Sequence, residues 1–449
     1  MIVKDNNSNS IQALENLGAR GKAVSKLLMI ENGIKIDKVI HEELSLSDKD
    51  YRLFSELVYG CTRQKLFLDY RIQELCHTST RQLPMEVLII LRMGVYQLLF
   101  LNKIPNYAII SEAVQLSKKT KFYKLSGLVN AILRKIAIKK KMEIKIEDPV
   151  ERLSIQFSHP KNLIERWRRQ FPLEKLEKIL QGDNLPHSIF LKIKPDQRER
   201  VQLDLKSFEW KLVENLPDTL EIQMGRNKLF QTQSFLNGDW FVQDWTPQTM
   251  LSIAPIQEGQ QIWDVCASPG SKSLWMAITA GRDGKVLATD NSNEKLLKIS
   301  ESVQRMGLNN IEYFNGEISR LPKPRRFDLI WVDAPCSGTG VLSRRADLRW
   351  KWSVENLKNH QKKQSEILEI IEPHCYGGGW IVYSTCSLEP EENEQVISNF
   401  LDQFPTYEII NPASNNIPDI EVMKSGTYFL PTENHDGGFL SILKKKVLV

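Results

Sequence analysis

The C-terminal half of the chain is patterned as alternating strands and helices. From about Gln243 onward, short apolar runs recur, and stretches of helical periodicity separate most of them. The runs are Ile262–Val265, Val286–Ala288, Ile311–Phe314, Leu329–Val332, Trp380–Tyr383 and Phe439–Leu443. The expected helices are Ser271–Ala280, Glu294–Met306 and Lys358–Ile371. Because strands of a parallel sheet are buried on both faces, these runs predict an α/β, Rossmann-like domain with a doubly wound sheet.

Three of these predicted strands end in a loop that carries a cysteine. The segments are IWDVCASPGSKS (Ile262–Ser273), DLIWVDAPCSGTG (Asp328–Gly340) and YSTCSLEPEENE (Tyr383–Glu394). Ahead of the third, three glycines before Trp380 predict a turn, and Glu389–Glu394 predicts the start of a helix. Doubly wound domains bind their ligands at the carboxyl ends of strands, so we expect the functional site at these loops.

The first loop and the strand after it favour a nucleoside cofactor. Gly270 supplies a tight turn before a helix, and the next strand ends in Asp290, whose carboxylate can accept the two ribose hydroxyls. The chain contains neither GxGxxG nor GxxxxGK[ST], so a pyrophosphate or a nucleoside triphosphate is not indicated. S-adenosylmethionine, a nucleoside without phosphates, would suit this loop, although a plain structural turn is an equal alternative. Glu317 could bind the adenine edge, but a lone glutamate is more often only solvated.

The other two loops hold the residues expected to do chemistry. Cys336 follows Asp333, which can hydrogen-bond a ring nitrogen of a pyrimidine, and Cys386 follows the next long strand. A thiolate that adds to carbon 6 of cytosine makes carbon 5 nucleophilic enough to take a methyl group, after which a base removes the carbon-5 proton. A buried structural cysteine is the usual alternative for one cysteine. It is harder to sustain for two cysteines at neighbouring strand ends.

The front of the chain is patterned as helices throughout. The 449 residues are too many for one core, so two or three domains are expected. Between Ile11 and Lys145, Pro84–Leu101 is apolar nearly all round and predicts a central buried helix. Lys118–Lys145 holds ten basic residues and one acid, which favours a surface for a polyanion, although a solvated helix face is as plausible. Residues 1–10 are polar and predicted to be disordered.

Residues 148–245 form a mixed region that predicts a small α+β linking domain. Ile189–Ile193 and Trp210–Val213 are its expected strands. Trp167–Phe171 interleaves aromatic and guanidinium groups that could stack on bases, or the aromatics could simply be core residues. The predicted division is therefore a helical domain at 1–147, the linking domain at 148–245 and the α/β domain at 246–449.

The composition of the chain indicates the cellular location that we expect for the protein. The six cysteines include no CxxC pair, which argues against a zinc site and a disulfide framework and favours a reduced, cytoplasmic location. The N-terminus lacks the apolar core of a signal peptide, and the apolar stretch Val87–Leu101 is too short to cross a bilayer. A soluble protein is expected, with no membrane partner, no metal and no sign of an oligomer, so most simply a monomer.

The motifs resemble two known families. DVCASPGSK, DAPCSGTG and YSTCSLEPEENE, in this order, resemble the RNA 5-methylcytosine methyltransferases. KIPNYAII, SEAVQLSKK and LSGLVNAILRK resemble the NusB-type, all-α RNA-binding fold. Together the two resemblances cover nearly the whole chain. They imply an S-adenosylmethionine-dependent enzyme that methylates carbon 5 of a cytosine in 16S ribosomal RNA through a covalent cysteine–cytosine intermediate.

The resemblance also implies a role for each matching residue. Cys386 would be the nucleophile, Cys336 would assist product release or act as the base, and Asp333 would lie near both the target base and the cofactor. The implied cofactor-binding residues are Cys266, Ala267, Ser268, Pro269, Gly270, Ser271, Lys272, Asp290, Glu317 and Asp333. The segment Arg344–Trp350 (RRADLRW) resembles the loop that follows the Pro-Cys motif in the family, and His435–Phe439 (HDGGF) resembles the start of its last strand.

Some positions depart from the family pattern. Ser268 and Ser271 stand where the family has Ala and Gly, Glu317 replaces an aspartate, Ala346 a proline and Gly438 an aromatic residue.

Two other functions are consistent with parts of the chain. One is an RNA-binding or antitermination factor with a silent methyltransferase fold. The other is a DNA cytosine methyltransferase, whose nucleophile would be Cys336. For RNA, we expect salt-dependent binding through Lys118–Lys145 and the arginines at 344–349.

Overall fold

The computed structural model describes residues 14, 16–41, 46–76, 79–139, 143–222, 226–321, 325–411 and 417–447. Residues 1–10, which the sequence predicts to be disordered, lie outside these ranges. The chain divides into two compact units. The first comprises Met1–Asn184 with Arg345–Lys351, and the second Leu185–Arg344 with Trp352–Val449.

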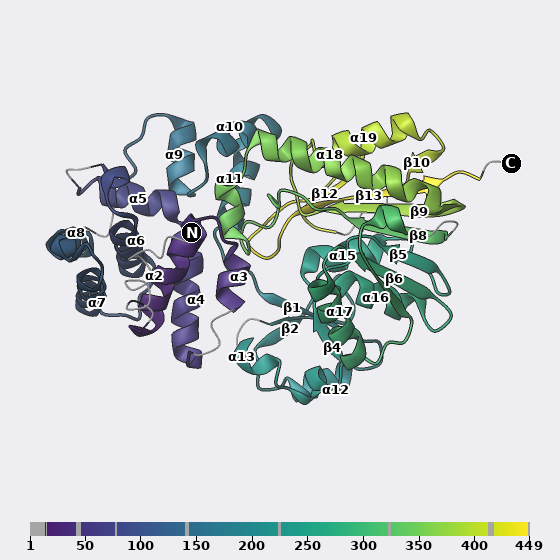
Figure 1. Cartoon of the computed structure of the whole chain (residues 1–449), viewed down its shortest axis with the longest axis horizontal. Coiled ribbons are helices and arrows are strands. Elements are labelled where there is room, and N and C mark those ends of the chain that lie inside the picture. Colours follow the sequence, from purple (N-terminus) through teal and green to yellow (C-terminus); the bar gives the residue numbers. More distant parts are fainter. Residues whose placement is uncertain are drawn as a thin grey trace, which may run out of the picture. The chain divides into compact units, whose positions relative to one another are not determined.

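The first unit is all-helical and is built around one buried helix (Figure 1). Its helices are α2 (Gly18–Glu31), α3 (Ile36–His41), α4 (Asp48–Arg63), α5 (Lys65–Gln73), α6 (Met85–Phe100), α7 (Asn106–Lys119), α8 (Ser126–Ile138), α9 (Pro149–Gln156), α10 (Lys161–Gln170) and α11 (Leu173–Gly182). Every residue of α6 from Val87 to Leu98 is buried, which confirms the predicted central helix. Glycines allow its close packing, because a Cβ on Gly94 would lie 2.7 Å from the Leu133 side chain.

Helix α8 is amphipathic in the predicted register. It buries Val129, Ile132, Leu133 and Ile136 and leaves Arg134 and Lys135 exposed. Lys118 and Lys119 at the end of α7 are also exposed, as are Lys121 and Lys124 in the connection between the two helices. The described part of the basic run therefore forms an exposed cationic surface on one end of this unit. Binding of RNA there stays a prediction.

Residues 148–184 cluster with the helical bundle, whereas the sequence analysis places them in the linking domain. Helix α9 packs against α5, and the Ser158 hydroxyl accepts a hydrogen bond from the Leu66 backbone N–H at 3.0 Å. Trp167 of α10 is fully buried, with its ring 6.2 Å from that of His159. Of the two interpretations of Trp167–Phe171, the structure supports a core position for the tryptophan.

The short segment Arg345–Lys351 packs in the first unit, although the chain on both sides belongs to the second. Arg349 is completely buried there, and its guanidinium donates to the carbonyls of Arg63, Ser158 and Asp183. Arg345 pairs with Asp37 at 3.2 Å. The expectation that the arginines at 344–349 contact RNA is therefore wrong for Arg349, because protein carbonyls occupy its donors.

The second unit begins with a small antiparallel sheet in the order β2-β3-β1-β4. The strands are β1 (Ile189–Ile193), β2 (Trp210–Leu212), β3 (Thr219–Ile222) and β4 (Trp240–Val242), and the helices are α12 (Arg198–Asp204), α13 (Arg226–Leu229) and α14 (Gln233–Leu236). This confirms both strands predicted for the linking region. Helix α15 (Trp245–Ile253) leads from it into a larger sheet.

The larger sheet has the order β11-β12-β13-β9-β8-β5-β6-β7, with β10 paired to β13. Its strands are β5 (Gln261–Asp264), β6 (Lys285–Asp290), β7 (Ile311–Asn315), β8 (Phe327–Asp333), β9 (Cys375–Thr385), β10 (Tyr407–Ile409), β11 (Ile420–Met423), β12 (Gly426–Phe429) and β13 (Gly438–Lys445). Strands β5 to β9 are parallel, and β13 joins antiparallel to β9. All six predicted strands are present, and the doubly wound α/β fold is confirmed.

Helices cover both faces of this sheet, as a doubly wound fold requires. Figure 1 shows α16 (Ser271–Ala280) and α17 (Asn293–Arg305) on one side, and α18 (Val354–Ile371) and α19 (Glu394–Gln403) on the other. In the sheet, β6 lies on one side of β5 and β8 lies on the other. The loops after β5 and β8 therefore meet at the point where the strand order reverses, the usual ligand crevice of such folds.

One of two local predictions near the last long strand is wrong. The glycines at 377–379 do not form a turn before the strand but lie inside β9, where Gly378 has φ +79° and the pairing with β8 is irregular. The helix predicted to begin within Glu389–Glu394 is present, but it starts only at Glu394, because residues 390–393 form a turn. None of the described helices is both long and apolar enough to cross a bilayer.

Candidate active site

The loop between β5 and α16 approaches the next helix so closely that Gly270 is needed. Gly270 has φ +104°, and a Cβ there would lie 2.8 Å from the Ile299 side chain of α17. The Ala267 backbone N–H donates to the Thr289 carbonyl at 3.0 Å, which ties the loop to the end of β6. Burial raises the pKa of the Cys266 thiol to about 12, so this cysteine is a neutral part of the loop rather than a nucleophile.

Asp290 stands at the end of β6, as predicted. Its side chain is buried, accepts a hydrogen bond from the Ser292 backbone N–H at 3.0 Å and lies 3.4 Å from Lys295 Nζ. Glu317 follows β7 but its side chain is 71% exposed and pairs only loosely with Arg320, at 3.5 Å. The structure therefore presents Asp290 as an ordered acceptor and Glu317 as a solvated surface group.

A further carboxylate, Asp264 at the end of β5, was not singled out from the sequence. One of its oxygens accepts from the Ser273 hydroxyl at 2.5 Å. The other, Oδ1, is buried and has no hydrogen-bond partner among the residues that the structure describes. Burial raises the pKa of this carboxyl to about 7. The sequence signal that could have identified Asp264 is an aspartate at the end of an otherwise apolar strand. Burial of a carboxylate there costs free energy, so such a residue often has a function.

Asp333 and Lys272 join the loops after β8 and β5. Lys272 Nζ lies 2.6 Å from Asp333 Oδ2, and the Ser384 hydroxyl donates to Asp333 Oδ1 at 2.9 Å. Burial disfavours the charged lysine, but the Asp333 carboxylate outweighs this effect and the pKa of Lys272 is raised. The pair is a fixed ion pair at the switch point of the sheet.

The two predicted catalytic cysteines lie in contact. Strands β8 and β9 are paired in parallel with Asp333 opposite Ser384, and the chains that leave them bring Cys336 Sγ to 3.1 Å from Cys386 Sγ. The hydrogen bond to Cys386 and burial raise the pKa of Cys336 well above its ordinary value. Cys336 is therefore a neutral thiol that can donate its proton toward the sulfur of Cys386. All six cysteines of the chain are free thiols.

The loop after Cys336 is also attached to the segment before β13. The Gly340 N–H donates to the Cys386 carbonyl at 2.9 Å, and the Gly437 N–H donates to the Gly340 carbonyl. A Cβ on Gly438 would lie 2.6 Å from the Thr385 carbonyl oxygen. The glycine here therefore lets β13 run directly against the strand end that carries Cys386.

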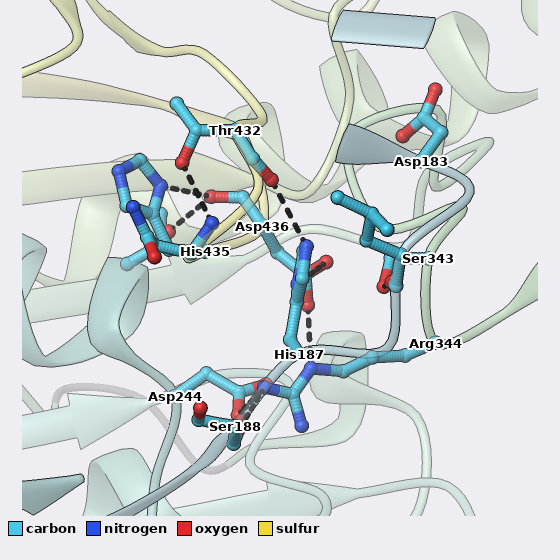
Figure 2. A network of polar contacts seen from close by, with 12 residues as sticks. Asp183, His187, Ser188, Asp244, Ser343, Arg344, Thr432, His435 and Asp436 are labelled. Carbon is cyan, nitrogen blue, oxygen red and sulfur yellow. Dashed lines mark hydrogen bonds and ion pairs between the residues drawn. The ribbon is translucent and has the colours of Figure 1, made fainter. Parts of the chain in front are cut away.

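A charged network supports these loops from the linking region, as Figure 2 shows. Arg344 Nε lies 2.8 Å from Asp436 Oδ2, and its Nη2 lies 2.8 Å from Asp244 Oδ1. His187 bridges the Thr432 carbonyl, 3.0 Å from Nε2, and Asp436 Oδ1, 3.1 Å from Nδ1. Burial raises the pKa of Asp244, while Arg344 opposes the shift. Arg344 is thus paired with two carboxylates while 29% of its side chain stays exposed, and its expected contact with RNA stays a prediction.

The second unit combines a Rossmann-like sheet with a glycine turn after β5, an acidic residue after β6 and paired thiols after β8 and β9. This combination defines the class of S-adenosylmethionine-dependent methyltransferases. Residues 250–444 match the family described as 16S rRNA methyltransferase RsmB/F, and residues 10–138 match the NusB family. A Synechocystis sp. (strain ATCC 27184 / PCC 6803 / Kazusa) protein named "probable ribosomal RNA small subunit methyltransferase B" is 31% identical over 92% of this chain and 95% of its own.

Other relatives agree with this match. The Bacillus subtilis (strain 168) protein of the same name is 31% identical over 89% of this chain and 88% of its own. The crystal structure of PH0851 shares the fold, with a TM-score of 0.77 at 21% identity over 97% of this chain and 98% of that chain. The chain belongs to the 16S rRNA methyltransferase RsmB/F family. It is an S-adenosylmethionine-dependent enzyme that acts on 16S ribosomal RNA.

The residues at the switch point fit the cofactor of this family. The buried Asp290 carboxylate can accept ribose hydroxyls, and the unpartnered Asp264 oxygen adds a second acceptor near the β5 loop. Asp290 pairs with Lys295 and Asp333 with Lys272, while the Asp264 oxygen without a described partner adds an acidic group, so this set of side chains has no excess of positive charge that would favour a phosphate. Among the residues that the structure describes, no group of His, Cys, Asp or Glu is arranged to hold a metal ion.

Proposed function

We propose that this enzyme methylates carbon 5 of a cytosine in 16S ribosomal RNA and that Cys386 is the nucleophile. The observation that carries the proposal is the contact of two thiols, Cys336 and Cys386, at 3.1 Å, beside the Lys272–Asp333 ion pair. Two thiols at the ligand crevice of a methyltransferase are hard to explain for attack by oxygen or nitrogen atoms of RNA. They suit a carbon that must first be made nucleophilic.

Each residue then has one task. The Cys386 thiolate forms a bond from Sγ to carbon 6 of the cytosine, and the electron pair of the 5,6 double bond becomes available at carbon 5. Bound S-adenosylmethionine supplies the electrophilic methyl group. Loss of the carbon-5 proton to a base restores the double bond and expels the Cys386 thiolate. Asp333, which Lys272 and Ser384 hold by hydrogen bonds, would accept a hydrogen bond from the protonated ring nitrogen of the cytosine, and Cys336 would assist release.

The base must leave the RNA stack for this reaction, since a side chain cannot reach carbon 6 within a helix. The exposed lysines and arginine of α7, α8 and their connection are the proposed contact with the RNA backbone. Lys118, Lys124 and Arg134 belong to this surface.

A reducing cytoplasm would keep both catalytic thiols free. The same sulfur contact also allows the reverse assignment, with Cys336 as the nucleophile.

The two assignments are separated by trapping the covalent intermediate. Wild type, Cys336→Ala and Cys386→Ala proteins are mixed with 16S ribosomal RNA and S-adenosylmethionine and run on a denaturing gel. We expect an RNA-shifted band only for Cys336→Ala, because an adduct through Cys386 would form and not be released. A shifted band only for Cys386→Ala would reverse the roles. Absence of adduct and of methyl transfer by the wild type would contradict the cytosine-5 reaction.

A further inference from the structure

One buried glutamate links the two cysteine loops and has no role in the scheme above. Glu392 lies in the turn between β9 and α19, and its side chain is fully buried. Its Oε1 accepts a hydrogen bond from the Ser337 backbone N–H at 2.8 Å. Its Oε2 accepts from the hydroxyls of both Ser337 and Ser387. Both oxygens of one carboxylate are therefore used, and the donors come from two different loops.

The two serines are the residues that directly follow the two cysteines. Ser337 follows Cys336, and Ser387 follows Cys386, 50 positions further along the chain. Their hydroxyls lie 3.1 Å apart and share the same carboxylate oxygen. The peptide unit between adjacent residues is planar and of fixed length, so an anchor on each serine also limits where the Cα atom of the neighbouring cysteine can lie. The Glu392 carboxylate thus binds the residue next to each of the two thiols.

Further hydrogen bonds hold Glu392 and the two cysteine loops in place. The Leu388 N–H donates to Thr339 Oγ1 at 2.9 Å, which adds a second link between the loops. Gln364 of α18 donates through Nε2 to the Pro335 carbonyl at 3.0 Å and approaches Glu392 Oε1 at 3.4 Å. The Tyr383 hydroxyl donates to the Glu392 carbonyl at 2.6 Å. The backbone and the side chain of Glu392 are both held, so its position is fixed rather than adjustable.

Ordinary stability is a poor explanation for this arrangement. Burial raises the pKa of Glu392, and the hydrogen bonds from Ser337, Ser387 and Gln364 oppose that shift without cancelling it, so the charged form is costly here. A buried charge of this kind is often no more stabilising than an apolar side chain of the same size. What an apolar residue could not do is accept three hydrogen bonds from two loops and so fix their separation.

We propose that Glu392 is a positioning residue that sets the contact between the Cys336 and Cys386 thiols by holding Ser337 and Ser387 on one carboxylate. The catalytic consequence rests on the proposed function, since it requires both thiols to act on one base. The geometric consequence does not. Loss of the carboxylate should separate the thiols whether or not the RNA reaction is the one proposed, and the two consequences can be measured independently.

The geometric test needs neither RNA nor cofactor. Dibromobimane has two bromomethyl arms; each thiolate displaces one bromide, so two adjacent thiols become bridged through two new carbon–sulfur bonds. The full-length wild type, Glu392→Gln and Glu392→Ala proteins are reacted to completion, and peptide mass spectrometry gives the ratio of bridged to singly alkylated product for Cys336 and Cys386. We expect predominant bridging in the wild type, and a ratio lower by about 10-fold in Glu392→Ala and by less in Glu392→Gln.

The matched control is Glu394→Gln, which removes the same charge two residues further on, at the first residue of α19. It should bridge as the wild type does. Ser387→Ala keeps the glutamate and removes one of its donors, so it should lower the ratio without burying a new unpaired charge. This variant keeps the test decisive if Glu392→Ala does not fold. A wild-type ratio in folded Glu392→Gln and Ser387→Ala, or absence of bridging in the wild type, would overturn the proposal.

The catalytic test uses 16S ribosomal RNA and labelled S-adenosylmethionine. We expect Glu392→Gln to lower kcat while KM for S-adenosylmethionine stays within about twofold, because Lys272 and Asp290 are untouched. Glu392→Asp should recover part of the lost kcat, since it restores the charge with a shorter reach. A parallel rise in KM for the cofactor would indicate a general structural defect and refute positioning. Lost bridging together with an inactive wild type would instead reject the proposed reaction and leave the positioning role standing.

Discussion

Substitution of Arg349 would show whether this arginine binds RNA or holds the segment Arg345–Lys351 in the first unit. Its guanidinium donates to three backbone carbonyls, those of Arg63, Ser158 and Asp183, and to Asn184 Oδ1 at 2.9 Å. The side chain is completely buried. We predict that Arg349→Ala releases Arg345–Lys351 from the first unit and has little direct effect on the affinity for RNA.

The expected size of this effect follows from two opposing contributions. Each buried carbonyl left without a donor costs roughly 1–3 kcal/mol, so the three carbonyls together give roughly 3–9 kcal/mol. Burial lowers the pKa of Arg349 from 12.5 to about 10, so removal of the buried cation recovers roughly 3.5 kcal/mol at about 1.4 kcal/mol for each pKa unit. The net loss is about 2.5 kcal/mol near the middle of this range, which corresponds to roughly a 70-fold increase in local opening.

Hydrogen exchange of the full-length protein measures this opening directly. In peptides that cover 345–351, the amides of Leu348 and Lys351, which donate to Arg345 and Leu348 carbonyls, report on the segment. Arg134→Ala on the exposed face of α8 is the control. It should leave exchange unchanged, weaken RNA binding and reduce the slope of log affinity against log salt by about 1. If Arg349→Ala instead exchanges like the wild type and lowers the salt slope as Arg134→Ala does, the guanidinium contacts phosphate and the reasoning is refuted.

Two further predictions concern the cofactor loop. Gly270→Ala places a Cβ 2.8 Å from the Ile299 side chain at φ +104°, so calorimetry should show S-adenosylmethionine affinity reduced by about 10-fold, and unchanged affinity would contradict a close-fitting loop. The pKa of Asp264 is raised to about 7 from 3.8, so the folded state holds this proton more tightly than the unfolded state, and the stability from the neutral carboxyl is lost as the pH rises toward 7. Thermal melts should therefore show Asp264→Asn less sensitive than the wild type to a rise from about pH 5 to pH 8, by up to ~1.4 kcal/mol for each pH unit; equal slopes would mean that Asp264 is already ionised.

The fold and the centre of the site could be predicted because they depend on local signals. Continuous apolar runs mark buried parallel strands, and the ends of such strands meet at one edge of the sheet whatever the loops do. Asp290, Asp333, Cys336 and Cys386 all lie within three residues of a strand end, and the pairing of β8 with β9 accounts for the contact between the two cysteines. Glu317 also follows a strand, but its side chain is 71% exposed, and its predicted contact with the cofactor stays a prediction.

What could not be predicted depends on pairings between residues far apart in the sequence. A buried arginine and an arginine on an RNA-binding surface have the same sequence signature, and only the carbonyls around Arg349 separate them. The same holds for Glu392, which in sequence is one of four glutamates in EPEENE and differs from the others by the two serines that meet on its carboxylate. A run of charged residues predicts solvent exposure when its members are judged one by one, yet Glu389 and Glu392 are both fully buried. The role of Glu392 could not be predicted because the donors to its carboxylate come from elsewhere in the fold, and two of them are the serines next to the two sulfurs.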